Sequence, residues 1–222
     1  MLISLANVLG LVLTWLIWLW VIDREFSLGS SLAITLGGPI LVAPLVYLGR
    51  RFLDQQPEMR RAIWLTTGMH YLLLTLLGAS VIEATRLAQN FSLWPVRLPP
   101  WLGIGVMVAS GAALVLVVFN LALKGFGLPF ALALTRLVAT DWLYAWTRNP
   151  MVLSALAFLV GLGLWLQSGL FLVWALVIFS PAIYVFLVIY EERELEIRFG
   201  QDYLNYKAST PMFWPRRPRR NS

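Results

Sequence analysis

The sequence predicts an all-α polytopic membrane protein of about six transmembrane helices, with a C-terminal helical hairpin and a short cytoplasmic helix behind it. Of its 222 residues, 59% are hydrophobic and only 13% are charged, whereas about a quarter of the residues of a soluble domain are charged. The apolar residues form runs of about 20, which is the length that crosses the hydrocarbon of a bilayer. Lys and Arg gather in alternate connections between these runs, as they do in membrane proteins.

The first half of the chain contains four of the predicted spans. They are Leu2–Ile22, Leu28–Gly49, Ala62–Ile82 and Trp101–Leu123. Pro39 and Pro44 lie inside the second run and are predicted to kink it, which a membrane helix tolerates when its neighbours satisfy the freed carbonyls. We therefore divide the chain into residues 1–123, with four transmembrane helices, and residues 124–222, with the remaining elements.

The apolar stretch Val152–Tyr190 is too long for one crossing, and Gln167-Ser168-Gly169 divides it into the two arms of a hairpin. With six crossings, 14 of the 17 Lys and Arg residues fall on one side of the membrane and 3 on the other. Five crossings would divide them 7 against 10. The positive-inside rule therefore favours six helices with both termini in the cytoplasm.

Two groups of polar residues flank this hairpin on the predicted cytoplasmic side. The first is Lys124-Gly125-Phe126-Gly127-Leu128-Pro129, followed after a connector by Arg148-Asn149-Pro150-Met151. The second is Glu191-Glu192-Arg193-Glu194-Leu195, followed by Phe199-Gly200-Gln201-Asp202-Tyr203-Leu204-Asn205-Tyr206.

The order of these motifs resembles that of the isoprenylcysteine carboxyl methyltransferase and phospholipid N-methyltransferase superfamily, especially its small bacterial members. The resemblance covers Lys124 to about Arg217. It implies an S-adenosylmethionine-dependent methyltransferase of the bacterial inner membrane that acts on a lipid or lipidated acceptor. The cofactor-binding residues that it implies are Gly125, Gly127, Arg148, Glu191 and Glu192. It also places Arg148 and Asn149 as catalytic residues, and Tyr144, Tyr203 and Tyr206 as substrate-binding or packing residues.

The chemistry of the cofactor agrees with these residue types. Glycines let backbone N–H groups approach a ligand closely, and a carboxylate accepts strong hydrogen bonds from an ammonium group. The guanidinium of Arg148 can bind a carboxylate with two parallel hydrogen bonds. The sequence leaves open which of Glu191 and Glu192 matters more. Glu194 and Glu196 are expected further into the aqueous helix, where water screens them.

Two other functions remain open. One is an NADPH-dependent membrane reductase related to the steroid 5-alpha-reductases, whose C-terminal architecture is similar. The other is a non-catalytic membrane scaffold, because Trp142-Leu143-Tyr144 stands where the methyltransferases usually carry Gly-Pro-Tyr. Taken singly, Gly125 and Gly127 also fit a helix end, and the glutamates also fit a solvated helix face.

The remaining polar residues indicate partners and structure. The chain has no Cys and one His, which excludes disulfides and thiolate catalysis and leaves only carboxylates for a metal. Its basic residues lie in loops and in the tail Arg216–Arg220, where anionic lipid headgroups are the expected partner rather than nucleic acid. His70 is expected to make a structural hydrogen bond inside the third helix, and Glu83 and Arg86 are expected at the membrane interface.

Overall fold

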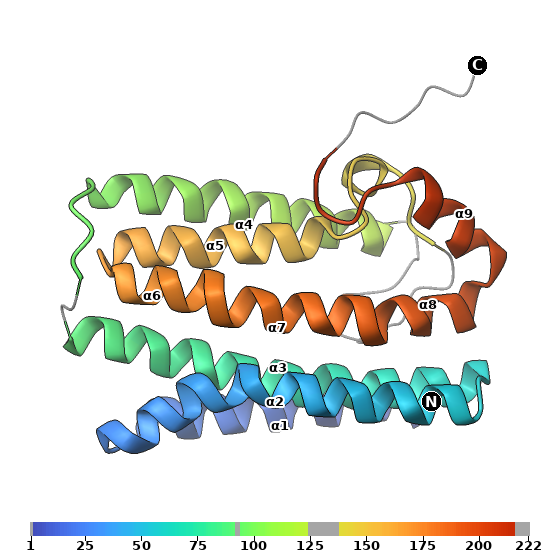
Figure 1. Cartoon of the computed structure of the whole chain (residues 1–222), viewed down its shortest axis with the longest axis horizontal. Coiled ribbons are helices and arrows are strands. Elements are labelled where there is room, and N and C mark those ends of the chain that lie inside the picture. The colour runs from blue at the N-terminus through green and yellow to red at the C-terminus, as the bar shows by residue number, and fades with distance from the viewer. Residues whose placement is uncertain (1, 92–93, 124–137, 216–222) are drawn as a thin grey trace.

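The computed structural model describes residues 2–91, 94–123 and 138–215, and over these ranges the chain is helical without β-strands (Figure 1). Five helices are long and apolar enough to cross a membrane. They are α1 (Leu2–Asp23), α2 (Leu28–Gln55), α3 (Met59–Asn90), α4 (Pro100–Leu123) and the continuous helix Gly169–Phe199. The all-α class and the multi-pass membrane character predicted from the sequence are therefore confirmed.

The continuous helix Gly169–Phe199 changes its winding along its length. It comprises α6 (Gly169–Val173), the π-helix η2 (Trp174–Phe179), α7 (Ser180–Val185), the π-helix η3 (Phe186–Glu191) and α8 (Glu192–Phe199). Pro181 is the second residue after η2, and the Ser180 hydroxyl between them donates to the Ala175 carbonyl at 2.7 Å. Proline has no N–H to donate inside a helix, and the wider π turn accommodates it without breaking the helix.

Helix α5 (Pro150–Trp165) precedes this continuous helix and is joined to it by a tight turn at Leu166–Ser168. Gln167 has a φ of 53° in this turn, and the Ser168 side chain caps α6 by accepting from the Phe171 N–H. With 16 residues, α5 is about 24 Å long at about 1.5 Å per residue. It is therefore shorter than the five long helices, against a hydrocarbon core of about 30 Å.

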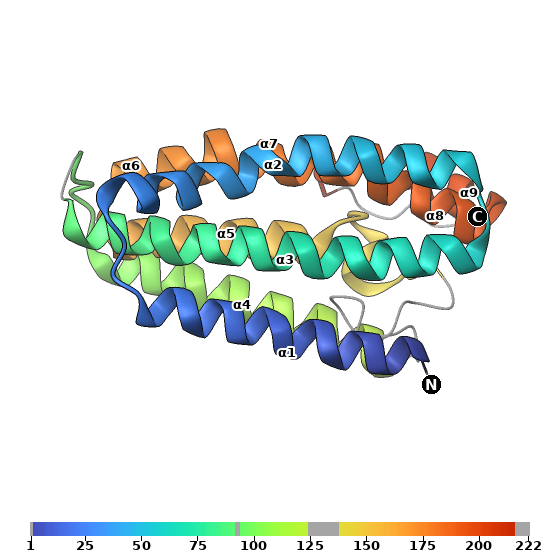
Figure 2. The ribbon, with the colours of Figure 1, turned by 90° about the horizontal axis from the view of Figure 1, so that it is seen from below.

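The helices pack in two groups (Figures 1 and 2). Helix α4 lies along α5, and Gly103 and Gly161 let the two backbones touch, since a Cβ on Gly103 would meet the Gly161 carbonyl at 2.6 Å. Helix α2 packs against α3 on one side and against the Gly169–Phe199 helix on the other. The buried core lies between these three helices and includes Val42, Val46, Leu53, Leu73, Leu77, Trp174, Leu187 and Tyr190.

Helix α1 packs mainly against α3 (Figure 2), and polar contacts fix their register. The hydroxyls of Thr14 and Thr75 lie 2.9 Å apart. At the other end of the interface, Arg86 donates to the carbonyls of Ile22 and Arg24, each at 2.9 Å. Glu83 was expected at the membrane interface, but its side chain is fully buried. It tolerates burial because Arg86 forms an ion pair with it.

The predicted boundaries of the apolar runs fit the structure except at α2, at α3 and at the second arm of the hairpin. This arm was predicted to end at Tyr190, but its helix continues to Phe199. Helix α2 continues past Arg50 to Gln55, and α3 begins at Met59 and continues to Asn90. Charged residues end a hydrophobic run, but they do not end a helix, because the backbone hydrogen bonds are unaffected. Inside α3, His70 makes the expected structural contact, with Nδ1 at 2.8 Å from the Thr66 carbonyl oxygen.

One end of the bundle carries most of the described basic residues, and we call it the basic end. The N-termini of α1, α3 and α5 lie there with the C-termini of α2, α4 and α8 (Figure 1). Its basic residues are Arg50, Arg51, Arg60, Arg61, Arg148, Arg193, Arg198 and Lys207. The opposite end has Arg24, Arg86 and Arg97.

Candidate functional site

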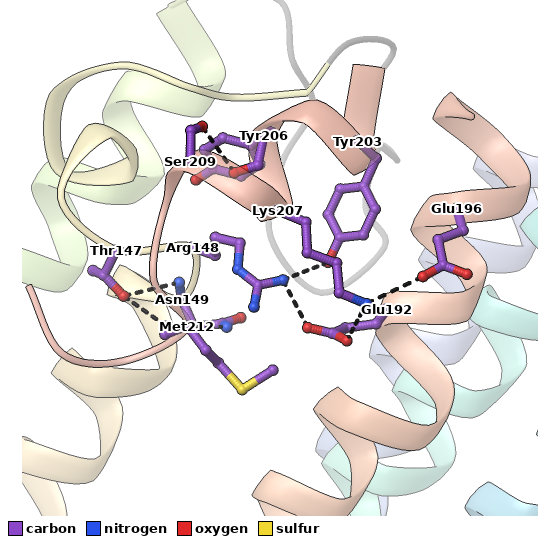
Figure 3. Close-up of polar contacts among 10 residues, drawn as sticks. All are labelled: Thr147, Arg148, Asn149, Glu192, Glu196, Tyr203, Tyr206, Lys207, Ser209 and Met212. Atoms are coloured by element: carbon purple, nitrogen blue, oxygen red, sulfur yellow. Dashed lines mark hydrogen bonds and ion pairs between the residues drawn. The ribbon is translucent and has the colours of Figure 1, made fainter. Parts of the chain in front are cut away.

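Three segments that are distant in the sequence meet at the basic end (Figure 3). They are the loop before α5, the first turn of α8, and α9 (Gln201–Ser209). Arg148 Nη1 donates to Glu192 Oε1 at 2.7 Å and contacts the Tyr203 hydroxyl at 3.2 Å. The side chains of Arg148 and Glu192 are only 11% and 13% exposed, so water screens this ion pair poorly.

The C-terminal residues Pro211 and Met212 hold the loop that carries Arg148. The Arg148 N–H donates to the Pro211 carbonyl at 2.9 Å, and the Thr147 hydroxyl donates to the Met212 carbonyl at 2.7 Å. The Asn149 side-chain amide also points to the Met212 carbonyl, at 3.4 Å. Asn149 therefore lies beside Arg148 at the start of α5, but its side-chain amide contacts the Met212 backbone rather than Glu192.

Gly200 sets the direction of α9. Its φ of 55° and ψ of −126° belong to a region that residues with a Cβ avoid. This turn separates α8 from α9 and brings Tyr203 and Tyr206 into the protein, where both are buried. The Tyr206 hydroxyl donates to the Tyr144 carbonyl at 2.7 Å. The glycine of the Phe199-Gly200 pair therefore has a structural role, because the turn at Gly200 directs α9 back toward Arg148.

Lys207 is a site residue that the sequence analysis did not select. Its ammonium lies 2.7 Å from Glu192 Oε2 and 3.2 Å from Glu196 Oε1. The hydrogen bond to Glu192 raises the pKa of Lys207 above its usual range, although partial burial opposes this shift. The available signal was its spacing, since Lys207 follows Tyr203 by four residues and so lies on the same face of a helix.

The three tyrosines of this region are held neutral. Burial raises the pKa of Tyr144, Tyr203 and Tyr206 above the ordinary value of 10.0. Nearby carboxylates add to the shift at Tyr144 and Tyr203, through Glu191 and Glu192 respectively. These hydroxyls therefore remain protonated at neutral pH and can donate as well as accept hydrogen bonds.

Unlike its neighbour Glu192, Glu191 has no hydrogen-bond or ion-pair partner among the described residues. Glu192, Glu194 and Arg148 lie close enough to act on it electrostatically, yet no hydrogen bond or ion pair joins Glu191 to the described part of the chain. Arg148 complements it, because the buried Nε of this guanidinium also has no hydrogen-bond partner among the described residues. Within the described part of this cluster, one acceptor and one donor therefore have no hydrogen-bond partner.

Glu194 was expected to be screened by water, and this expectation is wrong. Its side chain is 2% exposed and forms an ion pair with Arg198 at 2.8 Å. The cause is the packing of α8 against α3, which the sequence pattern did not reveal. Glu196, in contrast, is partly exposed and contacts Arg193 and Lys207.

A second set of contacts ties this region to the first half of the chain. Asp54 of α2 accepts from Arg50 at 2.6 Å and from Arg193 at 2.8 Å. Arg50 also donates to the Ile189 carbonyl at 3.1 Å, within the π-helix η3. The end of the Gly169–Phe199 helix is therefore fixed to α2 as well as to α9.

The structure thus brings together Arg148, Glu192 and Tyr203, with Glu191 adjacent and Tyr144 paired to Tyr206. Gly125 and Gly127 lie outside the described residues, as does the tail Arg216–Arg220. Within the described ranges, no three His, Asp or Glu side chains converge as a metal site would require. The chain matches no protein-family model, no curated protein and no solved structure.

Proposed function

We propose that this protein is an S-adenosylmethionine-dependent methyltransferase that acts on a lipid or lipidated acceptor at the cytoplasmic face of the membrane. The proposal joins the order of the sequence motifs to one observation. Among the described residues of the cluster around Arg148, Glu191 forms no hydrogen bond or ion pair, and Arg148 Nε is a buried donor without an acceptor.

Charge pairing among the described residues explains why these two groups point to a ligand. Glu192 is paired with Arg148, Glu194 with Arg198, and Glu196 with Lys207 and Arg193. A partly buried carboxylate without a counter-ion and a buried donor without a partner both cost free energy. A ligand that carries an ammonium and a carboxylate satisfies both, and the methionine moiety of S-adenosylmethionine carries this pair of groups.

Each residue of the cluster has its own role in binding or positioning the cofactor. In this proposal Arg148 binds the carboxylate of the methionine moiety, and Glu191 and Oε2 of Glu192 accept from its ammonium. Glu192 also holds Arg148 in place through Oε1. Gly125 and Gly127 contribute backbone contacts, as the motif resemblance implies. When bound, the cofactor supplies an activated methyl group on a sulfonium. The protein's contribution is then largely to hold the two reactants in line, which accounts for much of the rate of such displacements.

The position of the cluster suits an acceptor from the bilayer. We place the basic end in the cytoplasm, because eight of the described Lys and Arg residues lie there against three at the other end. In this orientation α5 and the Gly169–Phe199 helix form a hairpin that adds the fifth and sixth crossings. Both termini are cytoplasmic, the membrane is a bacterial inner membrane, and the tail Arg216–Arg220 binds anionic headgroups.

The charge balance favours this function over an NADPH-dependent reductase. NADPH carries several phosphate charges, which proteins bind with unpaired Arg or Lys side chains and helix N-termini. Arg148 and Lys207 already face Glu192, whereas the acidic group of Glu191 has no partner among the described residues of this cluster. A cationic cofactor suits this arrangement better than a polyanionic one.

Equilibrium binding to the purified, detergent-solubilised protein tests the proposal. Titrations with S-adenosylmethionine and with NADPH are compared for the wild type, Arg148→Gln, and Arg97→Gln at the opposite end as the matched control. We expect the wild type and Arg97→Gln to bind S-adenosylmethionine and Arg148→Gln to lose it. Binding of NADPH alone would indicate the reductase, and binding of neither would indicate the scaffold.

A further inference from the structure

The ammonium of Lys207 occupies a place that a positively charged ligand would also favour. Glu192 uses Oε1 for Arg148 and Oε2 for Lys207, each at 2.7 Å (Figure 3). Both of its oxygens are therefore taken by cations of the protein itself. A ligand cation that approaches Glu192 must replace one of the two.

The two cations are held very differently. The side chain of Arg148 is 11% exposed and donates to the Tyr203 hydroxyl. Its backbone N–H donates to the Pro211 carbonyl. Lys207 is 33% exposed and carries its charge on a flexible chain of four carbons. Partly exposed ion pairs of this kind contribute little to stability, so Lys207 is the cation that can move.

Lys207 also has a second carboxylate to move to. Glu196 lies one helical turn after Glu192, and its Oε1 is already 3.2 Å from the Lys207 ammonium. Moving fully onto Glu196 keeps the lysine paired and frees Glu192 Oε2. The exchange therefore requires a small motion of one side chain and leaves no charge without a partner.

We propose that Lys207 is a built-in competitor for Glu192, which a cationic ligand displaces onto Glu196. Lys207 is then a residue that determines specificity, because a ligand without a positive charge cannot displace it. This inference rests on the proposed function, since the cationic ligand used to test it is S-adenosylmethionine. It adds to that function a free-energy cost, because a cationic ligand must displace Lys207 from Glu192 in order to bind.

Chemical modification of Lys207 tests whether this lysine pairs mainly with Glu192 when no ligand is bound. The chain has only two lysines, Lys124 and Lys207, so peptide mass spectrometry follows each amine separately during reaction with an acylating reagent. Glu192→Gln removes the stronger partner of Lys207 and is expected to speed its acylation at least threefold. Glu196→Gln is the matched control and is expected to change the rate less than twofold. Equal effects of the two variants would overturn the inference.

Binding of S-adenosylmethionine to Lys207→Gln tests whether Lys207 competes with a cationic ligand. Arg193→Gln is the matched control. Arg193 is similarly exposed and also forms an ion pair with Glu196, but its side chain forms no ion pair with Glu192. We expect Lys207→Gln to bind at least threefold more tightly than the wild type, Arg193→Gln to stay within twofold, and Lys207→Arg to return toward the wild type. Melting temperatures confirm that the variants are folded.

The outcomes separate this inference from the proposed function. If the wild type binds S-adenosylmethionine and Lys207→Gln binds equally or more weakly, Lys207 is not a competitor, and the proposed function stands. If neither the wild type nor Lys207→Gln binds S-adenosylmethionine, the proposed function and the inference fall together.

Discussion

Arg148 and Glu192 are 44 positions apart in the sequence, and their side chains meet with 2.7 Å between Nη1 and Oε1. The pair joins the loop before α5 to the first turn of α8, and Tyr203 adds α9 to the same junction. The junction therefore depends on three segments at once, and substitutions in each of them have distinguishable effects on binding and on stability.

The two adjacent glutamates are expected to differ. Glu191→Gln removes this acceptor without breaking any hydrogen bond or ion pair to the described residues. It should therefore weaken S-adenosylmethionine binding at least tenfold, about 1.4 kcal/mol, and leave the melting temperature unchanged. Glu192→Gln should weaken binding and also lower the melting temperature, because Arg148 and Lys207 lose their partner. Binding isotherms and melting curves of both variants test this difference, and an unstable Glu191→Gln protein would contradict it.

Glu194 and Glu196 allow the stability contribution of a buried ion pair to be compared with that of partly exposed ion pairs. Glu194→Gln breaks the buried ion pair between Glu194 and Arg198, and breaking such a pair typically costs about 3–5 kcal/mol. Glu196→Gln breaks partly exposed pairs and should cost less than about 1 kcal/mol. Thermal or denaturant unfolding in detergent measures both, with Glu196→Gln as the control. Similar stabilities of the two variants would mean that the Glu194–Arg198 pair contributes little.

Gly200→Ala tests the turn that directs α9. A residue with a Cβ at a φ of 55° and a ψ of −126° is strained by about 1–3 kcal/mol. We expect faster proteolysis after Phe199 and weaker cofactor binding, because α9 no longer holds Tyr203 and Lys207 at the junction. Gly105→Ala in α4 is the control, since nothing lies within 4 Å of a Cβ placed there. An equally protected C-terminus in both variants would show that the turn tolerates alanine.

The buried tyrosines make α9 sensitive to alkaline pH. The pKa of Tyr206 is raised in the folded protein, so its contribution to stability is fully present below the unfolded pKa of about 10 and is lost as the pH rises above it. We expect the melting temperature to fall above pH 10, and to fall less in Tyr206→Phe. At pH 8 that variant should be less stable by about 1 kcal/mol, because it lacks the bond to the Tyr144 carbonyl. Melting curves between pH 8 and 11.5 measure both effects.

The orientation of the basic end can be read from cysteine labelling. The natural chain has no Cys, so each introduced residue is labelled alone. Gln55→Cys and Asn205→Cys are expected to react with a membrane-impermeant maleimide from the cytoplasmic side, and Ser27→Cys from the opposite side. All three side chains are exposed. If positions 55 and 205 react from opposite faces, the six-crossing arrangement is wrong.

The first four helices were predictable because run length and composition alone decide whether a segment fits a bilayer. The ends of these helices outside the membrane were not predictable. Arg50 and Arg51 end the hydrophobic run, but the α2 helix continues past them to Gln55. Within the candidate site, Arg148 and the glutamate pair were selected only through the order of motifs. No local pattern indicates that residues 44 positions apart form an ion pair.

The errors at Glu194 and Lys207 have one physical origin. A helix sequence shows which residues share a face, but not which face turns toward the protein. The face of Glu194 turned toward α3, and the face of Lys207 turned toward Glu192. Both depend on tertiary packing and on the backbone turn at Gly200, which local sequence patterns do not specify.

The contacts of Arg86 with the end of α1 bear on how the chain is made at the ribosome. The carbonyls of Ile22 and Arg24 are synthesised more than 60 residues before the arginine that binds them. A nascent chain that stops short of Arg86 leaves these carbonyls to water and lipid headgroups, and α1 still lacks the last contact that joins it to α3. We infer that the packing of α1 against α3 is completed only after Arg86 has been synthesised.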